Sequence, residues 1–187
     1  MDAFEELVAE ILRADGWWVH HGYRILLSTE EKRALDNPSM PRPEIDLVAY
    51  KAGTGELLAL ECKSYFDSGG VHARDLLGGK NAQRYKMFVD ARLREVVLNR
   101  LIAQLVASGS VIGAPVVKLG LVYGHATEGN AAIIQKHFAE NGWLLFGPDW
   151  LRGHLQTMAL QSYDNQIASV VAKLLLPRST RAMEAAA

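Results

Sequence analysis

Residues 44–63, EIDLVAYKAGTGELLALECK, contain two short strand patterns separated by a turn, and they decide how the rest of the chain is interpreted. Charged and apolar residues alternate at the start of this stretch, which is typical of a strand. The glycines within 51–55 predict a turn, and the apolar residues of 57–63 predict a second strand. We therefore expect the two strands to pair as a hairpin.

The segments on either side of this hairpin predict the remaining elements. Before it we expect a helix at 2–14, a strand at 17–27 bent near Gly22, and a loop at 28–43; after it we expect a loop at 67–79, helices at 81–107, 129–141, 148 onward and 161–175, and strands at 115–122 and 143–146. Consecutive strands favour a hairpin, and the later strand-helix-strand unit favours a parallel pair. The expected fold is α/β, a mixed sheet flanked by helices.

Length and composition limit the classes of protein that fit. The chain has 187 residues, a formal net charge of −1 and one cysteine. These values argue against a disordered chain, a strongly basic nucleic-acid coat, an internal disulfide and a Cys-rich zinc site. No apolar run reaches the ~18–20 residues of a membrane span, and the N-terminus lacks a signal-peptide pattern. We expect a cytoplasmic protein with an α/β core at 1–147 and a helical extension at 148–187 packed on it, its tail frayed from 177.

Four charged residues lie within the strand patterns of the hairpin, namely Glu44, Asp46, Glu61 and Lys63, and the last three are informative. Glu61 and Lys63 point to the same face of their strand because side chains alternate with a period of two. Fourteen residues separate Asp46 from Glu61, enough for two short strands and a turn, so the two acids can converge. Two adjacent carboxylates both stay charged when a cation lies between them, and oxygen ligands suit Mg²⁺, with Mn²⁺ as a substitute.

Lys63, beside the two acids, adds a positive charge that suits hydrolysis of a phosphate ester. An ammonium group beside a divalent cation can orient or activate an attacking water and stabilise negative charge on a phosphate. Two acids and Lys63 around Mg²⁺ would therefore suit phosphodiester hydrolysis. Alternatively, Glu61 and Lys63 would be a solvent-facing pair on an edge strand, and Asp46 would accept a hydrogen bond from a turn. Opposite facing of Asp46 and Glu61 would favour that second interpretation.

The same residues resemble the motif of the PD-(D/E)XK nuclease superfamily. Asp46 matches the first acid of the motif, and Glu61 and Lys63 match the rest, whereas Pro43 stands three residues before Asp46 rather than directly before it. The resemblance implies a restriction-endonuclease-like α-β-β-β-α-β core, here with extra C-terminal helices. It also implies a Mg²⁺-dependent endonuclease acting on DNA, with Asp46, Glu61 and the backbone carbonyl of Cys62 as metal ligands. Homodimers are frequent in such families.

A glutamate of the first helix is a candidate fourth site residue. Phe4-Glu5 and the later Leu12-Arg13-Ala14-Asp15-Gly16 resemble the first helix of Mrr-like and Holliday-junction-resolvase-like members, which carry such a glutamate. At ~100° per residue, Glu5 lies beside Leu12 at the rim of the apolar stripe, whereas Glu6 and Glu10 fall on the solvated side. Glu5 is therefore expected to assist at the rim of the site; the alternative is a first-turn glutamate that interacts with the helix dipole.

The segment after the lysine supplies a further candidate and a basic surface. RecB-like members carry a glutamine and a tyrosine here, but Gln83 and Tyr85 are two residues apart rather than four. Gln83 alone is expected to face the site, or else to be an ordinary exposed residue. From Arg74 to Arg100 seven basic residues outnumber three acidic ones, a local excess of +4 that would bind DNA or form a solvated helix face.

A non-catalytic function is the main alternative for the whole chain. A nuclease-fold module could bind nucleic acid or mediate assembly through the same basic segment without cutting. The clustered acids argue against this, because a pure binder gains nothing from negative charge near phosphates.

Overall fold

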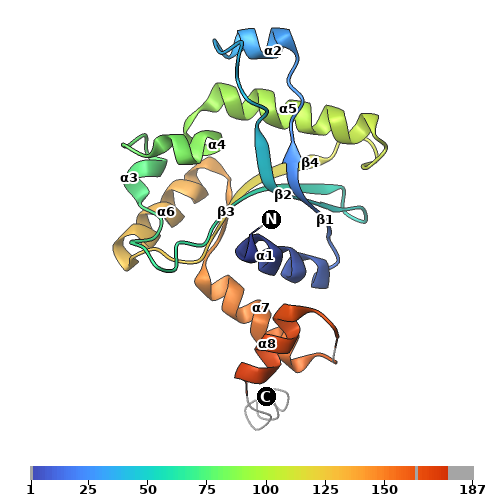
Figure 1. Cartoon of the computed structure of the whole chain (residues 1–187), viewed down its shortest axis with the longest axis vertical. Helices are drawn as coiled ribbons and strands as arrows, with labels where there is room; N and C mark the ends of the chain where they lie inside the picture. Colours follow the sequence, from blue (N-terminus) through green and yellow to red (C-terminus); the bar gives the residue numbers. More distant parts are fainter. Residues whose placement is uncertain (1, 163, 177–187) are drawn as a thin grey trace.

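The computed structural model describes residues 2–162 and 164–176. Its centre is a five-stranded mixed sheet in the order β1-β2-β3-β4-β5 (Figure 1). The strands are β1 (Trp18–Arg24), β2 (Glu44–Lys51), β3 (Glu56–Lys63), β4 (Val116–Tyr123) and β5 (Leu144–Phe146). The predicted α/β class, with a mixed sheet flanked by helices, is confirmed.

The strands pair as expected: the two strands of the hairpin are antiparallel, and those of the later strand-helix-strand unit are parallel. β2 is antiparallel to both β1 and β3, while β4 is parallel to both β3 and β5. The β2–β3 turn closes through hydrogen bonds from the N–H groups of Thr54 and Gly55 to the carbonyl of Lys51. Gly55 has a φ of 69°, a conformation that a residue without a side chain adopts without strain. The predicted hairpin and the predicted parallel pair are both present.

Helices cover both faces of this sheet (Figure 1). They are α1 (Ala3–Ala14), α2 (Thr29–Ala34), α3 (Ala73–Leu76), the 3-10 helix η1 (Ala82–Tyr85), α4 (Lys86–Val89), α5 (Ala91–Ala107), α6 (Glu128–Asn141), α7 (Pro148–Leu160) and α8 (Ile167–Leu175). The side chains between the sheet and α5, α6, α3 and α4 form what we call the α5-side core, which includes Leu57, Ala59, Val97, Leu121 and Phe138. Those between the sheet and α1, α7 and α8 form the α1-side core, which includes Val8, Leu47, Leu60, Val122 and Leu151.

Three expectations about the connecting segments are wrong. The single helix expected at 81–107 is divided into η1, α4 and α5, because Asp90 has an extended backbone and its carboxylate caps the N–H of Leu93 at 2.9 Å. The loop expected at 28–43 contains α2, which begins at a capping box formed by Ser28 and Glu31. The glycine-rich loop expected at 67–79 contains the short helix α3.

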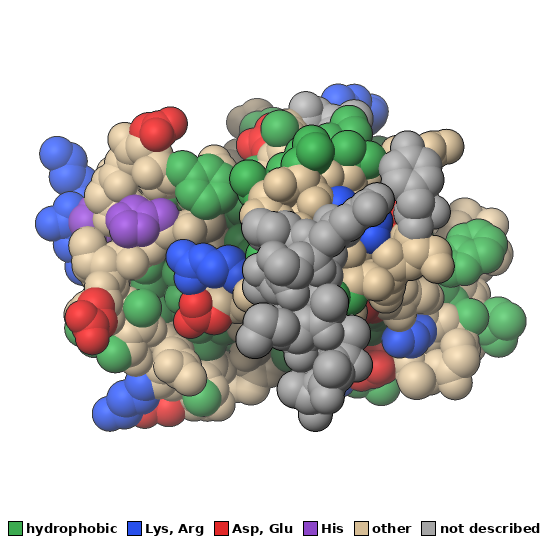
Figure 2. All heavy atoms as spheres, turned by 90° about the horizontal axis from the view of Figure 1, so that it is seen from below, with side chains coloured by type: hydrophobic (Ala, Val, Ile, Leu, Met, Phe, Trp, Pro, Cys, Tyr) green, Lys and Arg blue, Asp and Glu red, His purple; other side chains and the backbone are tan. Residues whose placement is uncertain are grey.

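The C-terminal helices pack back on the first helix. α7 contacts α1 and β5, and α8 contacts α1 and α7. The outer side of α8 leaves hydrophobic residues exposed, namely Ile167, Val171, Leu174 and Leu175. Figure 2 views this end of the molecule and shows hydrophobic side chains on its surface. The predicted frayed tail at 177–187 lies outside the described residues. Within 2–162 and 164–176, no helix has both the length and the apolar character needed to cross a membrane.

Candidate active site

The candidate site lies where the β2–β3 hairpin stops pairing regularly. The regular ladder ends with Leu47 opposite Leu60, so the next opposed residues are Asp46 and Glu61. There the N–H of Cys62 donates to the Asp46 carboxylate at 2.7 Å instead of to the β2 backbone. A side chain thus replaces a ladder bond and satisfies the backbone group, which fixes the position of the carboxylate.

A second irregularity on the other side of β2 coincides with this one. In the β1–β2 ladder, Gly22 is opposite Asp46, and regular pairing is interrupted between the flanking pairs. Gly22 has a φ of 56°, a left-handed conformation that bends β1 and that glycine adopts at low cost. At this point of β2, Ile45 and Leu47 contribute to opposite cores although they are two residues apart. The strand bend predicted near Gly22 therefore lies beside the candidate acid.

The structure brings Asp46, Glu61 and Lys63 together. The Lys63 ammonium is in direct contact with the Glu61 carboxylate, and its Nζ lies 3.9 Å from Oδ2 of Asp46. All three side chains are about one-fifth exposed, so solvent and a ligand can reach them. The two acids therefore lie on the same side of the sheet. Opposite sides would have favoured the alternative that Glu61 and Lys63 are only a solvent-facing pair.

Burial and mutual repulsion change the acid-base behaviour of this cluster. Burial, followed by the negative charge of Glu61, raises the pKa of Asp46 to about 6, although the Cys62 N–H and the Lys63 ammonium act in the opposite direction. Burial disfavours the charged form of Lys63, but the adjacent Glu61 and Asp46 outweigh it and raise the pKa of Lys63. Lys63 is therefore protonated at neutral pH, and it partly neutralises the two acids.

The donor atoms of the cluster suit a hard divalent cation. Asp46 and Glu61 supply carboxylate oxygens, the ligands that Mg²⁺ prefers, and their repulsion favours occupation by positive charge. Over the part of the chain that the structure describes, no group of three or more His, Cys, Asp or Glu side chains is close enough to hold a metal ion. Two carboxylates still suit Mg²⁺, because this ion usually keeps several waters.

Cys62 contributes through its backbone rather than through its thiol. Its side chain is buried in the α1-side core, on the face opposite Glu61 and Lys63, as the alternation predicts. Burial raises the pKa of the Cys62 thiol well above its ordinary range, so the group stays protonated and unreactive. The N–H of Cys62 positions Asp46, a role that the spacing did not indicate.

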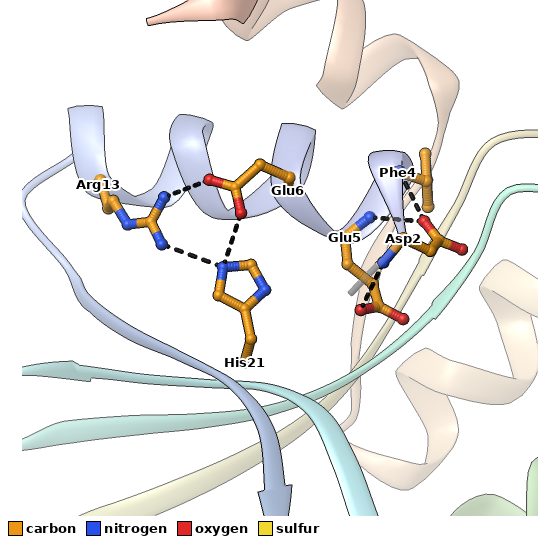
Figure 3. A network of polar contacts seen from close by, with 6 residues as sticks. All are labelled: Asp2, Phe4, Glu5, Glu6, Arg13 and His21. Carbon is orange, nitrogen blue, oxygen red and sulfur yellow. Dashed lines mark hydrogen bonds and ion pairs between the residues drawn. The ribbon is translucent and has the colours of Figure 1, made fainter.

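Glu5 is occupied at the start of its helix (Figure 3). Its carboxylate accepts a hydrogen bond from the Asp2 N–H at 3.3 Å, while the Asp2 carboxylate accepts from the N–H groups of Phe4 and Glu5, so the two acids form a capping box. Glu5 nevertheless lies close enough to Cys62 for its charge to contribute to the raised pKa of that thiol. The contacts thus match the first-turn alternative, and they leave Glu5 beside β3 as a candidate at the rim.

The prediction that Glu10 lies on the solvated side is wrong, whereas the Glu6 side chain is partly exposed, at 30%. Glu6 forms an ion pair with Arg13 at 2.7 Å, and its carboxylate lies 3.0 Å from Nε2 of His21, whose pKa is lowered by burial (Figure 3). Glu10 is only 6% exposed, and its carboxylate accepts a hydrogen bond of 2.7 Å from the N–H of Ala168 at the start of α8. A helix more than 150 residues away in the sequence therefore covers the side that α1 alone would leave in solvent.

Gln83 lies on the surface, and several of the basic residues between Arg74 and Arg100 contact other parts of the protein. Gln83 is exposed on η1, and it does not line the pocket that its neighbours Arg84 and Tyr85 help to form. Three arginines of α5 make contacts within the protein: Arg92 pairs with Asp36, Arg94 donates to the carbonyls of 87 and 88, and Arg100 donates to the carbonyl of Leu26. The remaining basic residues of this segment are exposed: Arg74, Lys80, Arg84 and Lys86.

A pocket beside the cluster was not predicted. It has a volume of about 270 Å³, and its lining includes Tyr65, His72, Arg74, Asp75, Arg84 and Tyr85; we call it the Tyr65 pocket. Tyr65 stands two residues after Lys63 and has a φ of 47°, which is unusual for a residue with a side chain. The closely spaced glycines of 69–79 were the signal that could have indicated a tightly folded loop at this place.

Comparisons of the chain with protein-family models, with curated proteins and with solved structures found no match. The functional interpretation therefore depends on the residues of the cluster and on their geometry. The structure brings together three of the predicted site residues, Asp46, Glu61 and Lys63, and the Cys62 N–H holds the Asp46 carboxylate. Glu5 lies near Cys62, whereas Gln83 is exposed on a separate segment.

Proposed function

We propose that this protein is a divalent-metal-dependent endonuclease that hydrolyses phosphodiester bonds of DNA, on a restriction-endonuclease-like core. The observation that carries the proposal is the convergence of Asp46, Glu61 and Lys63 at the point where β2 and β3 separate. A purely structural ion pair does not need a second carboxylate, whose presence raises the pKa of Asp46. Natural proteins accept such unfavourable clusters mainly at functional sites.

In this proposal Asp46 and Glu61 hold the cation, together with the backbone carbonyl of Cys62. Mg²⁺ or Mn²⁺, when bound there, would supply Lewis-acid chemistry toward a phosphate. Lys63 holds a positive charge at Nζ beside the two acids, where it can orient a water and stabilise the negative charge that develops on the phosphate. Partial burial strengthens these interactions, because little bulk water screens them.

Cleavage of DNA that requires the cation tests the proposed function directly. We expect supercoiled plasmid, linear duplex or single-stranded DNA to be cut with Mg²⁺ or Mn²⁺ and not with EDTA. Glu61→Gln should lower the rate by about 10²-fold or more, because it removes a charged ligand from the cluster. Glu56→Gln is a matched control, since Glu56 lies at the other end of β3 and pairs with Lys118. Failure to cut any of these DNA forms with either cation would refute the proposal.

The alternative function is a nuclease-fold module that binds nucleic acid without cutting it. The observation that favours it is the contact of the Lys63 ammonium with both acids, which already neutralises part of their charge. Such a module would need no cation at Asp46 and Glu61. Calorimetric titration therefore separates the two functions, because only the enzyme should bind Mn²⁺ in a way that both acids control.

The affinity for the cation is expected to depend on pH around 6. Because the pKa of Asp46 is raised to about 6, the carboxylate is charged above that pH and protonated below it. Protons and the cation compete for the same oxygens, so Mn²⁺ affinity should fall up to about tenfold per pH unit below 6 and level off above 7. Titrations at pH 5, 6 and 7.5 measure this. The same pH dependence in Asp46→Asn would show that another group is responsible.

A further inference from the structure

The Tyr65 pocket follows the candidate cluster in the chain, and Tyr65 lies close enough to Lys63 for its charge to contribute to the raised pKa of Lys63. Lys63 ends β3, and Tyr65 opens the loop that forms one wall of the pocket. Tyr65 and Tyr85 both pack on the α5-side core. Glu61 and Lys63 lie on that same face of β3, because they alternate in phase with Leu57 and Ala59. A strand of substrate that reaches Lys63 would therefore meet this pocket next.

The walls of the pocket are fixed by close backbone approaches. Gly70 pairs with Ala126, and the N–H of Val71 donates to the carbonyl of His125 at 2.9 Å, so the loop is held against the segment after β4. A Cβ at Gly70 would lie 2.6 Å from the His125 carbonyl oxygen, and a Cβ at Gly79 would lie 2.6 Å from that of Arg74. The pocket is therefore built from a tightly folded loop rather than left by loose packing.

The one acid in the lining is already satisfied within the protein. Asp75 is 3% exposed, and its carboxylate accepts hydrogen bonds from the backbone and side-chain nitrogens of Asn81 at 3.3 and 3.1 Å. Arg74 Nε lies 3.6 Å from the same carboxylate, which orients the guanidinium at the pocket. The two arginines Arg74 and Arg84 outnumber the single carboxylate of Asp75, so these three side chains together carry a formal charge of +1.

The lining combines donors for an anion with aromatic rings. The guanidinium groups of Arg74 and Arg84 suit the planar, two-point recognition of phosphate oxygens. The Ser68 hydroxyl donates to the Tyr65 carbonyl at 3.2 Å and so helps to hold the loop. The partly exposed ring of Tyr65 offers a surface on which a sugar or base can pack, and Tyr85, which is only 3% exposed, supports it from the core. A free inorganic anion would use only the first of these features, whereas a nucleotide unit would use both.

We propose that the Tyr65 pocket binds the phosphate of a nucleotide that neighbours the bond being cut, with Arg84 and Arg74 as its charged contacts. This assignment rests on the proposed nuclease function and gives that site a substrate subsite. It makes the pocket a positioning device, because a phosphate anchored there fixes the register of the strand at Lys63. The phosphate is either internal to the strand or at its end.

Binding in EDTA tests the pocket separately from cleavage. Fluorescence anisotropy of a labelled oligonucleotide should show a Kd about 5- to 10-fold weaker for Arg84→Gln and for Arg74→Gln, with the slope of log K against log salt reduced by about 1 in each. Arg84→Lys should recover part of the affinity. Arg152→Gln is the control, since Arg152 is an exposed arginine of α7 that pairs with Asp149. Oligonucleotides with and without a 5′-phosphate distinguish a terminal phosphate from an internal one. A Kd that depends on Arg84 for either oligonucleotide supports the pocket.

The outcomes for the pocket and for the nuclease are distinguishable. Unchanged Kd and salt slope in both arginine variants would overturn the pocket, even if the wild type cuts DNA. Arg84-dependent binding in a protein that never cuts DNA would support the pocket as an anion site and refute the nuclease. With an active enzyme, the variants should raise KM more than they lower kcat, and thermal unfolding should show that each is folded.

Discussion

Lys63→Ala is expected to lower the rate of DNA cleavage by about 10²–10³-fold while the protein remains folded. The substitution removes the only positive charge that contacts Glu61 and lies near Asp46 among the described side chains. Nothing then remains at that position to stabilise negative charge on a phosphate. Single-turnover nicking of supercoiled plasmid in Mg²⁺ measures the loss, because this assay separates the chemical step from product release.

A matched lysine distinguishes this role from a general effect of charge. Lys86→Ala removes an exposed lysine of α4 that has no ion pair within the described residues, so it should leave the rate of cleavage within a few-fold of the wild type. Lys63→Arg should keep the positive charge but not the position of the ammonium, because a guanidinium is larger and planar. Its rate of cleavage should fall between those of the wild type and of Lys63→Ala. Wild-type cleavage by a folded Lys63→Ala variant would remove Lys63 from the mechanism.

Asp46→Asn is expected to stabilise the cation-free protein at pH 8 by about 1–3 kcal/mol while abolishing cleavage. Burial and the charge of Glu61 raise the pKa of Asp46 from an ordinary value of 3.8 to about 6, so the folded state holds the proton more tightly than the unfolded state. This favourable contribution is complete below pH 3.8 and is lost as the pH rises through 6. The amide avoids the cost of the buried charge and can still accept from the Cys62 N–H.

Chemical denaturation at pH 8 and at pH 4 measures this effect. The gain in the free energy of unfolding should be present at pH 8 and should shrink toward zero at pH 4, where Asp46 is largely protonated in the folded protein. Asp36→Asn is the control, because Asp36 is exposed and its one ion pair within the described residues is with Arg92; it should change stability by no more than about 0.5 kcal/mol. A destabilised Asp46→Asn variant at pH 8 would show that the carboxylate is a structural group.

Together the two expected results would be typical of a site that favours function over stability. The charged pair Asp46 and Glu61 lowers stability at neutral pH, and Lys63 relieves only part of that cost. An increase in stability on removal of a charged site residue is the expected sign of such a compromise.

Local patterns in the sequence determined the central hairpin and the direction of its side chains. Alternation between 44 and 50 and the turn at 51–55 led to β2 and β3, and the fourteen-residue separation placed Asp46 opposite Glu61. A period of two put Glu61 and Lys63 on one face and the Cys62 thiol on the other. These features could be predicted because strand geometry depends on neighbouring residues alone.

Only the tertiary structure decided the features that depend on distant segments. Glu10 is buried because α8 covers it. The Asp46 carboxylate is held in place because the β2–β3 pairing ends there and the Cys62 N–H donates to it. The Tyr65 pocket forms where the loop after β3 meets α3 and η1. Periodicity along a chain records which face of an element is apolar. It does not record which remote helix will cover a polar side chain or where two paired strands will separate, because those outcomes depend on how the whole chain packs.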